Sequence, residues 1–329
     1  MARKLLICLP LTIILLTASL AHAQQLKKVP RIGFVTAVGD ANAPGPLVEA
    51  FRQGLRDLGY IEGKNILVEF RYAEGKADRM PSLVNELVRL NVDVLVVPTL
   101  DAVHAARQAT KTVPIVMVIS DDPVATGLVD SLAHPGGNIT GLTRLQRELS
   151  GKRLELLKEA VSHISRVAVL RDADSQTAGI GFKEYEAAAH PLRVQLESLA
   201  VRGPKPDLES ALQNTANGRV NALVTITSTL LFFRQKEIAD LAIRNRLPSM
   251  FEGSTWVEAG GLISYSTNDR EVFRRIATYI DKILKGAKPG DLPVEQPTNF
   301  ELVINLKTAK QIGLTIPQSV LYRADKLIK

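Results

Sequence analysis

The architecture of the chain is decided by residues 121–143, DDPVATGLVDSLAHPGGNITGLT. They follow the apolar run 114–119, which reads as a buried strand, so the two acids stand at a strand's carboxyl end, where an α/β sheet presents its loops to a ligand. The Pro-Gly-Gly-Asn at 135–138 cannot continue a helix, because proline fixes φ and lacks a backbone donor. A short strand at 139–142 and a helix from about Ser150 come next. We place the first crossing between two lobes here.

On both sides of this stretch, apolar strands alternate with amphipathic helices, which is the pattern of parallel α/β layers. Residues 92–97, VDVLVV, are nearly continuous in apolar side chains, as expected of a strand covered on both faces. A second crossing is predicted at 260–266. The amphipathic helix 270–285 then returns to the first lobe, and the linker 289–297, with three prolines, crosses once more.

The predicted fold is therefore an α/β protein of two lobes with parallel sheets, joined by a hinge of three crossings. The expected N-terminal lobe is discontinuous and comprises residues 29–146 and 267–297. The expected C-terminal lobe comprises residues 147–266 and 298–329. A chain of 329 residues with 46% hydrophobic side chains is long enough for two such cores.

The first residues have the features of a secretory signal peptide. A positive start at Arg3 and Lys4 precedes the apolar run 5–20, and Ala-His-Ala ending at Ala23 forms a small-residue cleavage site before Gln24. Since the apolar run is only slightly short of a membrane span, an uncleaved anchor is the alternative. We expect cleavage near Ala23 and a mature protein in the periplasm.

Charge and cysteine content exclude several classes of protein. Removing residues 1–23 takes away two basic residues and no acid, so the formal charge falls from +7 to +5. The basic residues are scattered rather than gathered with aromatic ones, which favours a solvated basic surface over a nucleic-acid site. The one cysteine, Cys8, lies in the signal, so the mature chain has no disulfide to form.

Motifs of catalysis and of metal or cofactor binding are incomplete. Gly179-Ile180-Gly181 resembles part of a dinucleotide fingerprint, but Glu184 stands where the third glycine belongs. No phosphate-binding loop or nucleophile elbow occurs, and the histidines lack metal-ligand spacing. Two carboxylates, Asp172 and Asp174, are too few for a metal site. We expect no cofactor, no metal and no enzymatic activity.

Loops at the predicted strand ends supply hydroxyls, backbone donors and acids. Hydroxyls and helix N-termini suit a carboxylate, whereas an acid suits an ammonium group. The candidates are Thr36, Asp40, Thr99, Ser120, Asp121 and Asp122 in the first lobe, and Asp172, Asp174, Ser175, Thr227, Ser228, Thr229 and Glu252 in the second. Helix capping is the alternative for each, because caps use the same residue types. Tyr265 and Trp256 either stack on a ligand or pack in the core or hinge.

Several motifs resemble the ABC transporter substrate-binding protein family, in the branch that includes tryptophan/tyrosine-type solute-binding proteins. They are the run 51–65 (FRQGLRDLGYIEGKN), Asp122-Pro123-Val124 with Gly127-Leu128-Val129, the run 135–141 (PGGNITG), the run 292–297 (LPVEQP), the run 305–310 (NLKTAK) and Arg323-Ala324-Asp325. The resemblance covers essentially the whole mature chain. It implies a type I periplasmic binding-protein fold, in which two Rossmann-like lobes close on a small solute and deliver it to an ABC permease in the inner membrane.

The resemblance also implies ligand contacts at strand-end loops, best matched by Thr36, Thr99, Ser120, Asp121, Asp122, Asp172, Thr227 and Glu252. It leaves the solute open, and we expect a small polar or zwitterionic one, with an amino acid as one case, bound by a monomer. A sugar is less compatible with a chain that has 5% aromatic residues and one tryptophan. The alternatives from other classes are a sensory protein that presents its ligand to a membrane receptor and a secreted α/β enzyme.

Overall fold

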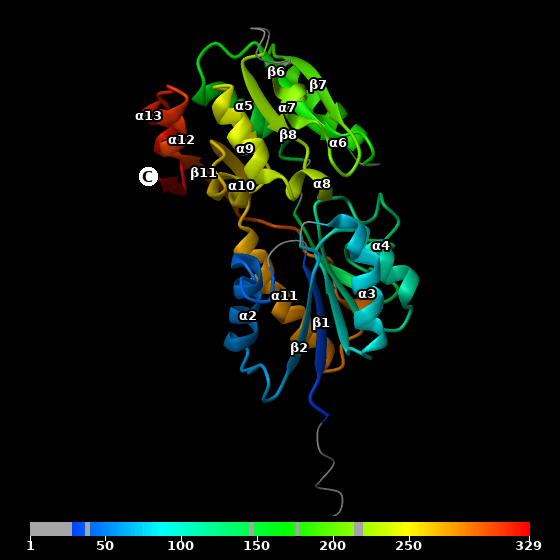
Figure 1. Ribbon diagram of the computed structural model, residues 1–329. Helices are drawn as coiled ribbons and strands as arrows, with labels where there is room; N and C mark the ends of the chain where they lie inside the picture. The colour runs from blue at the N-terminus through cyan, green and yellow to red at the C-terminus, as the bar shows by residue number, and fades with distance from the viewer. Residues whose placement is uncertain (1–27, 37–39, 75, 145–147, 176–177, 214–219) are drawn as a thin grey trace, which may run out of the picture.

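The computed structural model describes residues 28–36, 40–74, 76–144, 148–175, 178–213 and 220–329. The predicted signal peptide, residues 1–23, lies outside this range. Two α/β lobes follow one another along the long axis of the molecule (Figure 1). Within the described range, none of the helices combines the length and the apolar character that a membrane span requires.

The N-terminal lobe is built on a five-stranded parallel sheet with the order β2-β1-β3-β4-β5. Its strands are β1 (Arg31–Thr36), β2 (Leu67–Tyr72), β3 (Val94–Val97), β4 (Ile115–Ile119) and β5 (Ile139–Thr143). Every residue of β3, β4 and β5 is buried, because helices cover both faces of the sheet.

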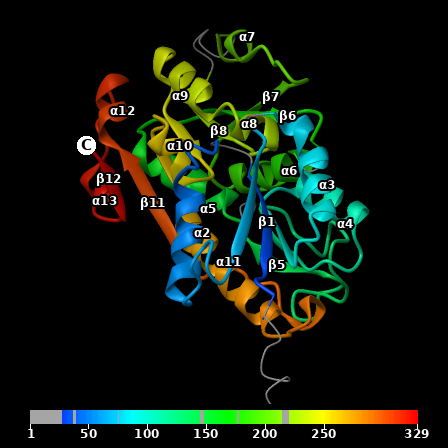
Figure 2. The same ribbon diagram turned by 60° about the horizontal axis from the view of Figure 1, so that its bottom comes forward.

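Side chains that alternate along each strand enter two separate cores in this lobe. One core lies under α2 (Pro46–Asp57) and α11 (Asp269–Leu284), and the other lies under α3 (Met80–Arg89) and α4 (Leu100–Ala109). Helices α2 and α11 lie side by side although they are far apart in the chain (Figure 2). Gly54 permits this close approach, because a methyl group there would overlap the carbonyl oxygen of Arg274.

The C-terminal lobe has a seven-stranded sheet with the order β12-β11-β10-β9-β8-β6-β7. Its strands are β6 (Arg166–Asp172), β7 (Gln195–Val201), β8 (Ala222–Thr225), β9 (Ser249–Phe251), β10 (Ile263–Thr267), β11 (Phe300–Asn305) and β12 (Lys326–Ile328). All neighbours are parallel except β10 and β11. The prediction of parallel sheets therefore holds for the first lobe and needs one correction in the second. Strand β11 enters directly from the other lobe, so it needs no crossover helix to reverse direction.

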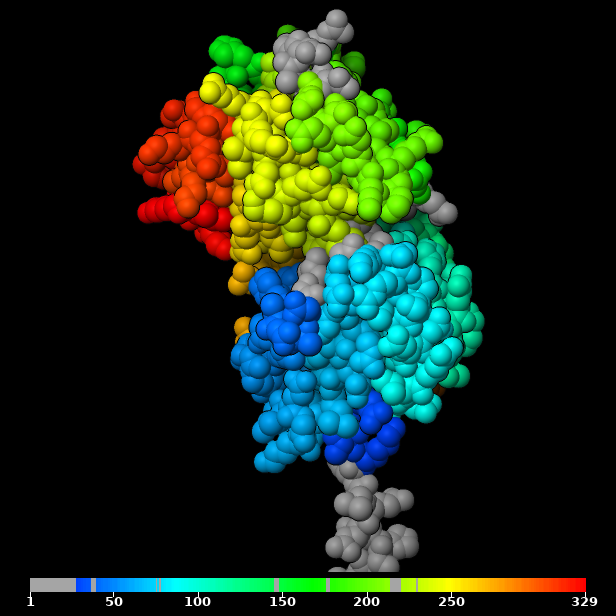
Figure 3. Space-filling view, in the orientation of Figure 1, coloured from blue at the N-terminus to red at the C-terminus, as the bar shows by residue number. Residues whose placement is uncertain are grey.

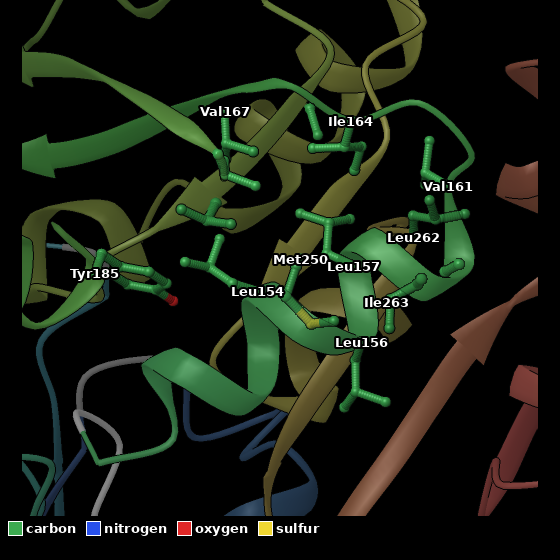
Figure 4. Close-up of a cluster of buried hydrophobic side chains, with 14 of the residues drawn as sticks. Leu154, Leu156, Leu157, Val161, Ile164, Val167, Tyr185, Met250, Leu262 and Ile263 are labelled. Atoms are coloured by element: carbon green, nitrogen blue, oxygen red, sulfur yellow. The ribbon is translucent and has the colours of Figure 1, made fainter. Parts of the chain in front are cut away.

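Helices cover both faces of this second sheet as well. Helices α5 (Ser150–Ala160), α6 (Ala178–Ala189), α12 (Leu306–Gln311) and α13 (Gln318–Leu321) enclose the core on one face. Figure 4 shows part of this core, in which Leu154 and Leu157 of α5 lie near Tyr185 and Met250. Helices α7 (Leu208–Gln213), α9 (Gln235–Arg244) and α10 (Ser254–Glu258) cover the other face.

The chain passes between the two sheets three times. The first passage joins β5 to α5, the second joins β10 to α11, and the third follows the short 3-10 helix Pro289–Asp291 and ends at β11. The lobes meet along a waist that is visible on the molecular surface (Figure 3). The short helix α8 (Thr229–Phe232) of the second lobe lies at this waist, beside the first lobe (Figure 1).

Candidate ligand-binding site

A cavity of about 380 Å³ lies between the lobes, at the carboxyl ends of strands from both sheets. Its volume is in the range of small-molecule sites. Carboxyl ends of parallel strands meet at one edge of each sheet, and the two edges face each other across the waist. The side chains that line it come from the ends of β1, β3, β4, β5, β6 and β8 and the loops after them, and from helices α2, α4, α8 and α11.

Six hydroxyl-bearing residues line the cavity: Thr36, Thr99, Ser120, Ser175, Thr227 and Ser228. Thr99 is the N-cap of α4 and accepts a hydrogen bond from the Ala102 backbone amide at 3.3 Å, so it both caps the helix and faces the cavity. The Thr227 hydroxyl is buried and has no hydrogen-bond partner among the described residues. A ligand oxygen or nitrogen beside Thr227 would satisfy this group.

Four carboxylates also line the cavity, from Asp101, Asp121, Asp172 and Asp174. Asp121, from the first lobe, and Asp172, from the second, are each 8% exposed. Asp172 accepts a hydrogen bond from the Asp174 backbone amide at 3.0 Å, which fixes the turn after β6. The two carboxylates give the cavity negative charge on both lobes, which is complementary to a ligand ammonium group.

Arg144 is the cationic lining residue in the described range, and His104 lines the same cavity. Arg144 follows β5 and forms an ion pair with Asp269 at 2.8 Å, with its guanidinium 5.7 Å from the Phe273 ring centre. His104 lies on α4, one turn after Leu100 and Asp101. Arg144 and the first turn of α4 are the parts of the wall best suited to a ligand carboxylate.

Apolar side chains complete the wall: Leu47, Pro98, Leu100, Ile119, Phe232 and Phe273. Phe232 of α8 also packs against the buried cluster of the first lobe, together with Phe233. Two aromatic rings, one from each lobe, therefore face a ligand in this cavity.

Six of the ten site residues expected from the sequence line the cavity: Thr36, Thr99, Ser120, Asp121, Asp172 and Thr227. Their contact with a ligand remains a prediction. Asp174, Ser175 and Ser228, weighed as strand-end candidates, also line it. The other four residues lie elsewhere.

Asp40 and Asp122 serve the turns in which they stand. The Asp40 carboxylate accepts from the amides of Asn42 and Ala43, and the Asp122 carboxylate accepts from Val124 at 2.8 Å. Both aspartates are exposed and are absent from the cavity lining. Asp40 and Asp122 therefore fit the alternative prediction of a capping role rather than the prediction of ligand contact.

Glu252 and Tyr265 are also absent from the cavity lining. The buried Glu252 pairs with Arg153 and accepts a hydrogen bond from the Thr227 amide. Tyr265 lies on β10 and packs against the core of the second lobe and against Phe300, whose ring centre is 6.0 Å away. Trp256 is 1% exposed and stacks on Phe251 in the core, so it too is a packing residue.

Several lining residues were missed by reasoning from the sequence: Leu47, His104, Arg144, Phe232 and Phe273. Most of them stand on helices, whereas most of the residues predicted from the sequence stand at the ends of strands. One signal was present for α4, since Leu100, Asp101 and His104 share the face that begins at the N-cap Thr99. Nothing local marked Phe273, because α11 reaches this wall only through the second crossing.

This geometry defines a class: a two-lobed α/β binding protein with a small-molecule cavity between its lobes, of the type I periplasmic binding-protein fold. The model of the family "ABC transporter substrate binding protein" matches residues 35–328, and the chain belongs to this family. The family resemblance and the fold class predicted from the sequence are thereby confirmed.

Three known proteins are similar to this chain over most of its length. A tyrosine-binding protein of Clostridioides difficile (strain R20291) is 25% identical over 267 residues, which cover 81% of this chain and 76% of that protein. A crystal structure of a conserved domain protein from Vibrio cholerae O1 biovar El Tor is 28% identical, with a TM-score of 0.81 and coverage of 91% and 100%. The structure of "the ABC domain in complex with L-Trp from Streptococcus pneumonia" is 25% identical, with a TM-score of 0.80 and coverage of 91% and 99%.

Proposed function

We propose that this solute-binding component of an ABC transporter captures a zwitterionic amino acid, with an aromatic side chain, in the cavity between its lobes. The observation that carries the proposal is the pair Asp121 and Asp172, two buried carboxylates that reach the same cavity from opposite lobes. An ammonium group between them would form charge-assisted hydrogen bonds with carboxylates of both lobes. The relatives named for tyrosine binding and complexed with tryptophan support the same ligand class.

In this proposal the ligand carboxylate faces Arg144 and the first turn of α4, and the ligand ring lies against Phe232 and Phe273. Both ends of the amino acid are then recognised by charge, and its side chain is recognised by apolar area. The cavity of about 380 Å³ has room for a single amino acid of this kind.

We further propose that the lobes, residues 29–146 with 267–297 and residues 147–266 with 298–329, move as rigid bodies about the three crossings. Contacts from both lobes exist together only in the closed form, so a ligand that uses both shifts the population toward closure. The closed monomer, which lies outside the cytoplasm, then delivers its solute to a permease in the membrane. Catalysis, nucleic-acid binding and bound cofactors have no part in this proposal.

The test is a titration of the chain from Gln24 onward with L-tryptophan, L-tyrosine and L-phenylalanine, followed by calorimetry and by thermal unfolding. A ligand at one hundred times its dissociation constant raises the unfolding free energy by about 2.7 kcal/mol. Glucose and glycerol serve as negative controls. Lack of any heat or thermal shift with all three amino acids would overturn the proposed ligand class.

Neighbouring aspartates offer a matched pair for this titration. Asp121→Asn should weaken amino-acid binding at least tenfold, because it removes a buried charge from the cavity. Asp122→Asn should leave the affinity within twofold, because Asp122 is exposed and asparagine can accept the same turn hydrogen bonds. Equal losses in both variants would contradict the assignment of Asp121.

A further inference from the structure

The Glu252 carboxylate accepts a hydrogen bond from the Thr227 backbone amide at the ligand cavity. This amide is the first one after β8 that lies beyond the hydrogen-bond ladder of the sheet. Strand β8 ends at Thr225, and the Ile226 amide still donates to the Leu170 carbonyl of the neighbouring β6. The next amide, of Thr227, lies two residues beyond the end of β8 and donates to the Glu252 carboxylate at 2.7 Å. Glu252 directly follows β9, so its side chain extends the sheet by one hydrogen bond from the adjacent strand.

Three cavity-lining residues depend on the direction that the chain takes at Thr227. Thr227 and Ser228 line the cavity themselves, and the Ser228 hydroxyl accepts from the Leu231 amide to begin α8. Helix α8 then brings Phe232 to the cavity and against the cluster of the first lobe. A shift of the Thr227 amide would therefore move the whole second-lobe wall that α8 forms.

Arg153 connects this anchor to the hinge. Its side chain is fully buried, with a terminal nitrogen 3.4 Å from Glu252 and its Nε donating to the Tyr265 carbonyl at 2.8 Å. Arg153 lies in the first turn of α5, immediately after the first crossing, and Tyr265 lies on β10, two residues before that strand ends at the second crossing. One guanidinium thus joins the cavity wall to the elements at two crossings.

We propose that Glu252 and Arg153 are positioning residues of the ligand site, which hold the Thr227–Phe232 wall in a fixed relation to the hinge strand β10. A buried ion pair is expensive to desolvate, and an apolar pair of similar volume would stabilise a core as well or better. The ion pair is explained here by the directionality of the hydrogen bond, because the Glu252 carboxylate has to accept from one particular backbone amide, that of Thr227. The environment is strongly desolvated, since burial raises the pKa of the adjacent Tyr185 hydroxyl.

Two double variants separate positioning from folding. Arg153→Met with Glu252→Gln removes both charges but keeps a side-chain oxygen that can accept from the Thr227 amide. Arg153→Met with Glu252→Ala removes both charges and the acceptor. Removing both charges together avoids an unpaired buried charge, so both double variants should fold. Val320→Ala, a buried position on α13 in the same lobe, controls for loss of stability alone.

The first readout is amide hydrogen exchange of the ligand-free protein over residues 226–233. We expect exchange of the Thr227 amide to be at least tenfold faster in the Met/Ala variant than in the wild type. Exchange in the Met/Gln variant should stay within threefold of the wild type, and Val320→Ala should leave this segment unchanged. Equal exchange in the two double variants would overturn the positioning role.

The second readout is affinity for L-tryptophan, and it rests on the proposed function. The Met/Ala variant should bind at least tenfold more weakly than the wild type, whereas the Met/Gln variant should bind within threefold. If the wild type fails to bind L-tryptophan, the proposed ligand is wrong, and hydrogen exchange alone still decides the positioning role. Equal affinities in the two variants, with a wild type that binds, would show that the anchor does not position the site.

Discussion

Arg144 and Asp269 form an ion pair at 2.8 Å that joins the first crossing of the hinge to the start of the second-crossing helix α11. Their side chains are 14% and 8% exposed, so the pair is largely shielded from water. Arg144 also lines the ligand cavity, which places the pair between hinge and site. Removing either partner leaves the other charge buried without its counterion.

Arg144→Met should therefore lower the free energy of unfolding by about 3 kcal/mol, because Asp269 loses its compensating charge. Chemical denaturation of the ligand-free protein measures this loss. Lys152→Met is the control, since Lys152 and Glu155 form an exposed pair at 2.9 Å, and it should change stability by less than about 1 kcal/mol. Similar losses of unfolding free energy in both variants would show that the buried Arg144–Asp269 pair stabilises the protein no more than an exposed pair does.

Phe232 is expected to support closure as well as ligand contact, because it packs on the cluster of the opposite lobe. Phe232→Ala should weaken amino-acid binding at least tenfold and increase the radius of gyration of the ligand-free protein in solution scattering. Ile180→Ala, an exposed apolar position on α6, should change neither quantity. An unchanged radius together with unchanged affinity would remove α8 from the closing contact.

Gly54 should tolerate no side chain, because α2 and α11 touch there. Gly54→Ala would force the helices apart at the Arg274 carbonyl, and we expect a loss of roughly 2 kcal/mol, the size typical of overpacking. Gly179 of α6 is the matched control, because a methyl group there meets nothing within 4 Å. Gly179→Ala should raise stability by about 0.5–1 kcal/mol through helix propensity. A lower midpoint of thermal unfolding for Gly54→Ala and a higher one for Gly179→Ala would confirm the helix contact at Gly54.

Glu301 gives the stability of the protein a specific pH dependence. Burial raises the pKa of its carboxyl, a hydrogen bond with Ser254 offsets part of the rise, and the charge of Asp269 adds to it. The folded chain therefore binds this proton more tightly than the unfolded chain does. Between the two pKa values the folded state carries more protons, so this group makes the unfolding free energy fall as pH rises through that window.

Glu301→Gln removes this ionisation while its side-chain oxygen can still accept from the side-chain amide of Asn268, as Glu301 does at 3.0 Å. The variant should gain stability over the wild type at pH 7, and the gain should shrink as pH falls toward the ordinary glutamate pKa of about 4.3 and stay constant below it. Urea unfolding across pH 4–7 measures the difference. A difference that is constant with pH would show that Glu301 has the same pKa in both states.

Local sequence patterns determined the alternation of strands and helices, the two-lobed class and the return of the chain at residues 260–266 and 289–297. The physical reason is that covered parallel strands need continuous apolar runs and amphipathic helices need a period of 3.6 residues, both of which can be read along the chain. The family resemblance and the solute-binding class followed from motifs in the same way, and the family match confirms both.

Tertiary structure decided which strand-end side chains reach the cavity. Asp121 and Asp122 are neighbours of one residue type, yet one lines the cavity and the other closes an exposed turn, because the backbone direction after β4 sets them apart. Glu252 likewise lies beneath the wall rather than in it, since the Thr227 amide needs an acceptor. Arg144 and Phe273 face the ligand space only because the hinge brings distant segments together, and such packing between remote parts has no local signature in a sequence.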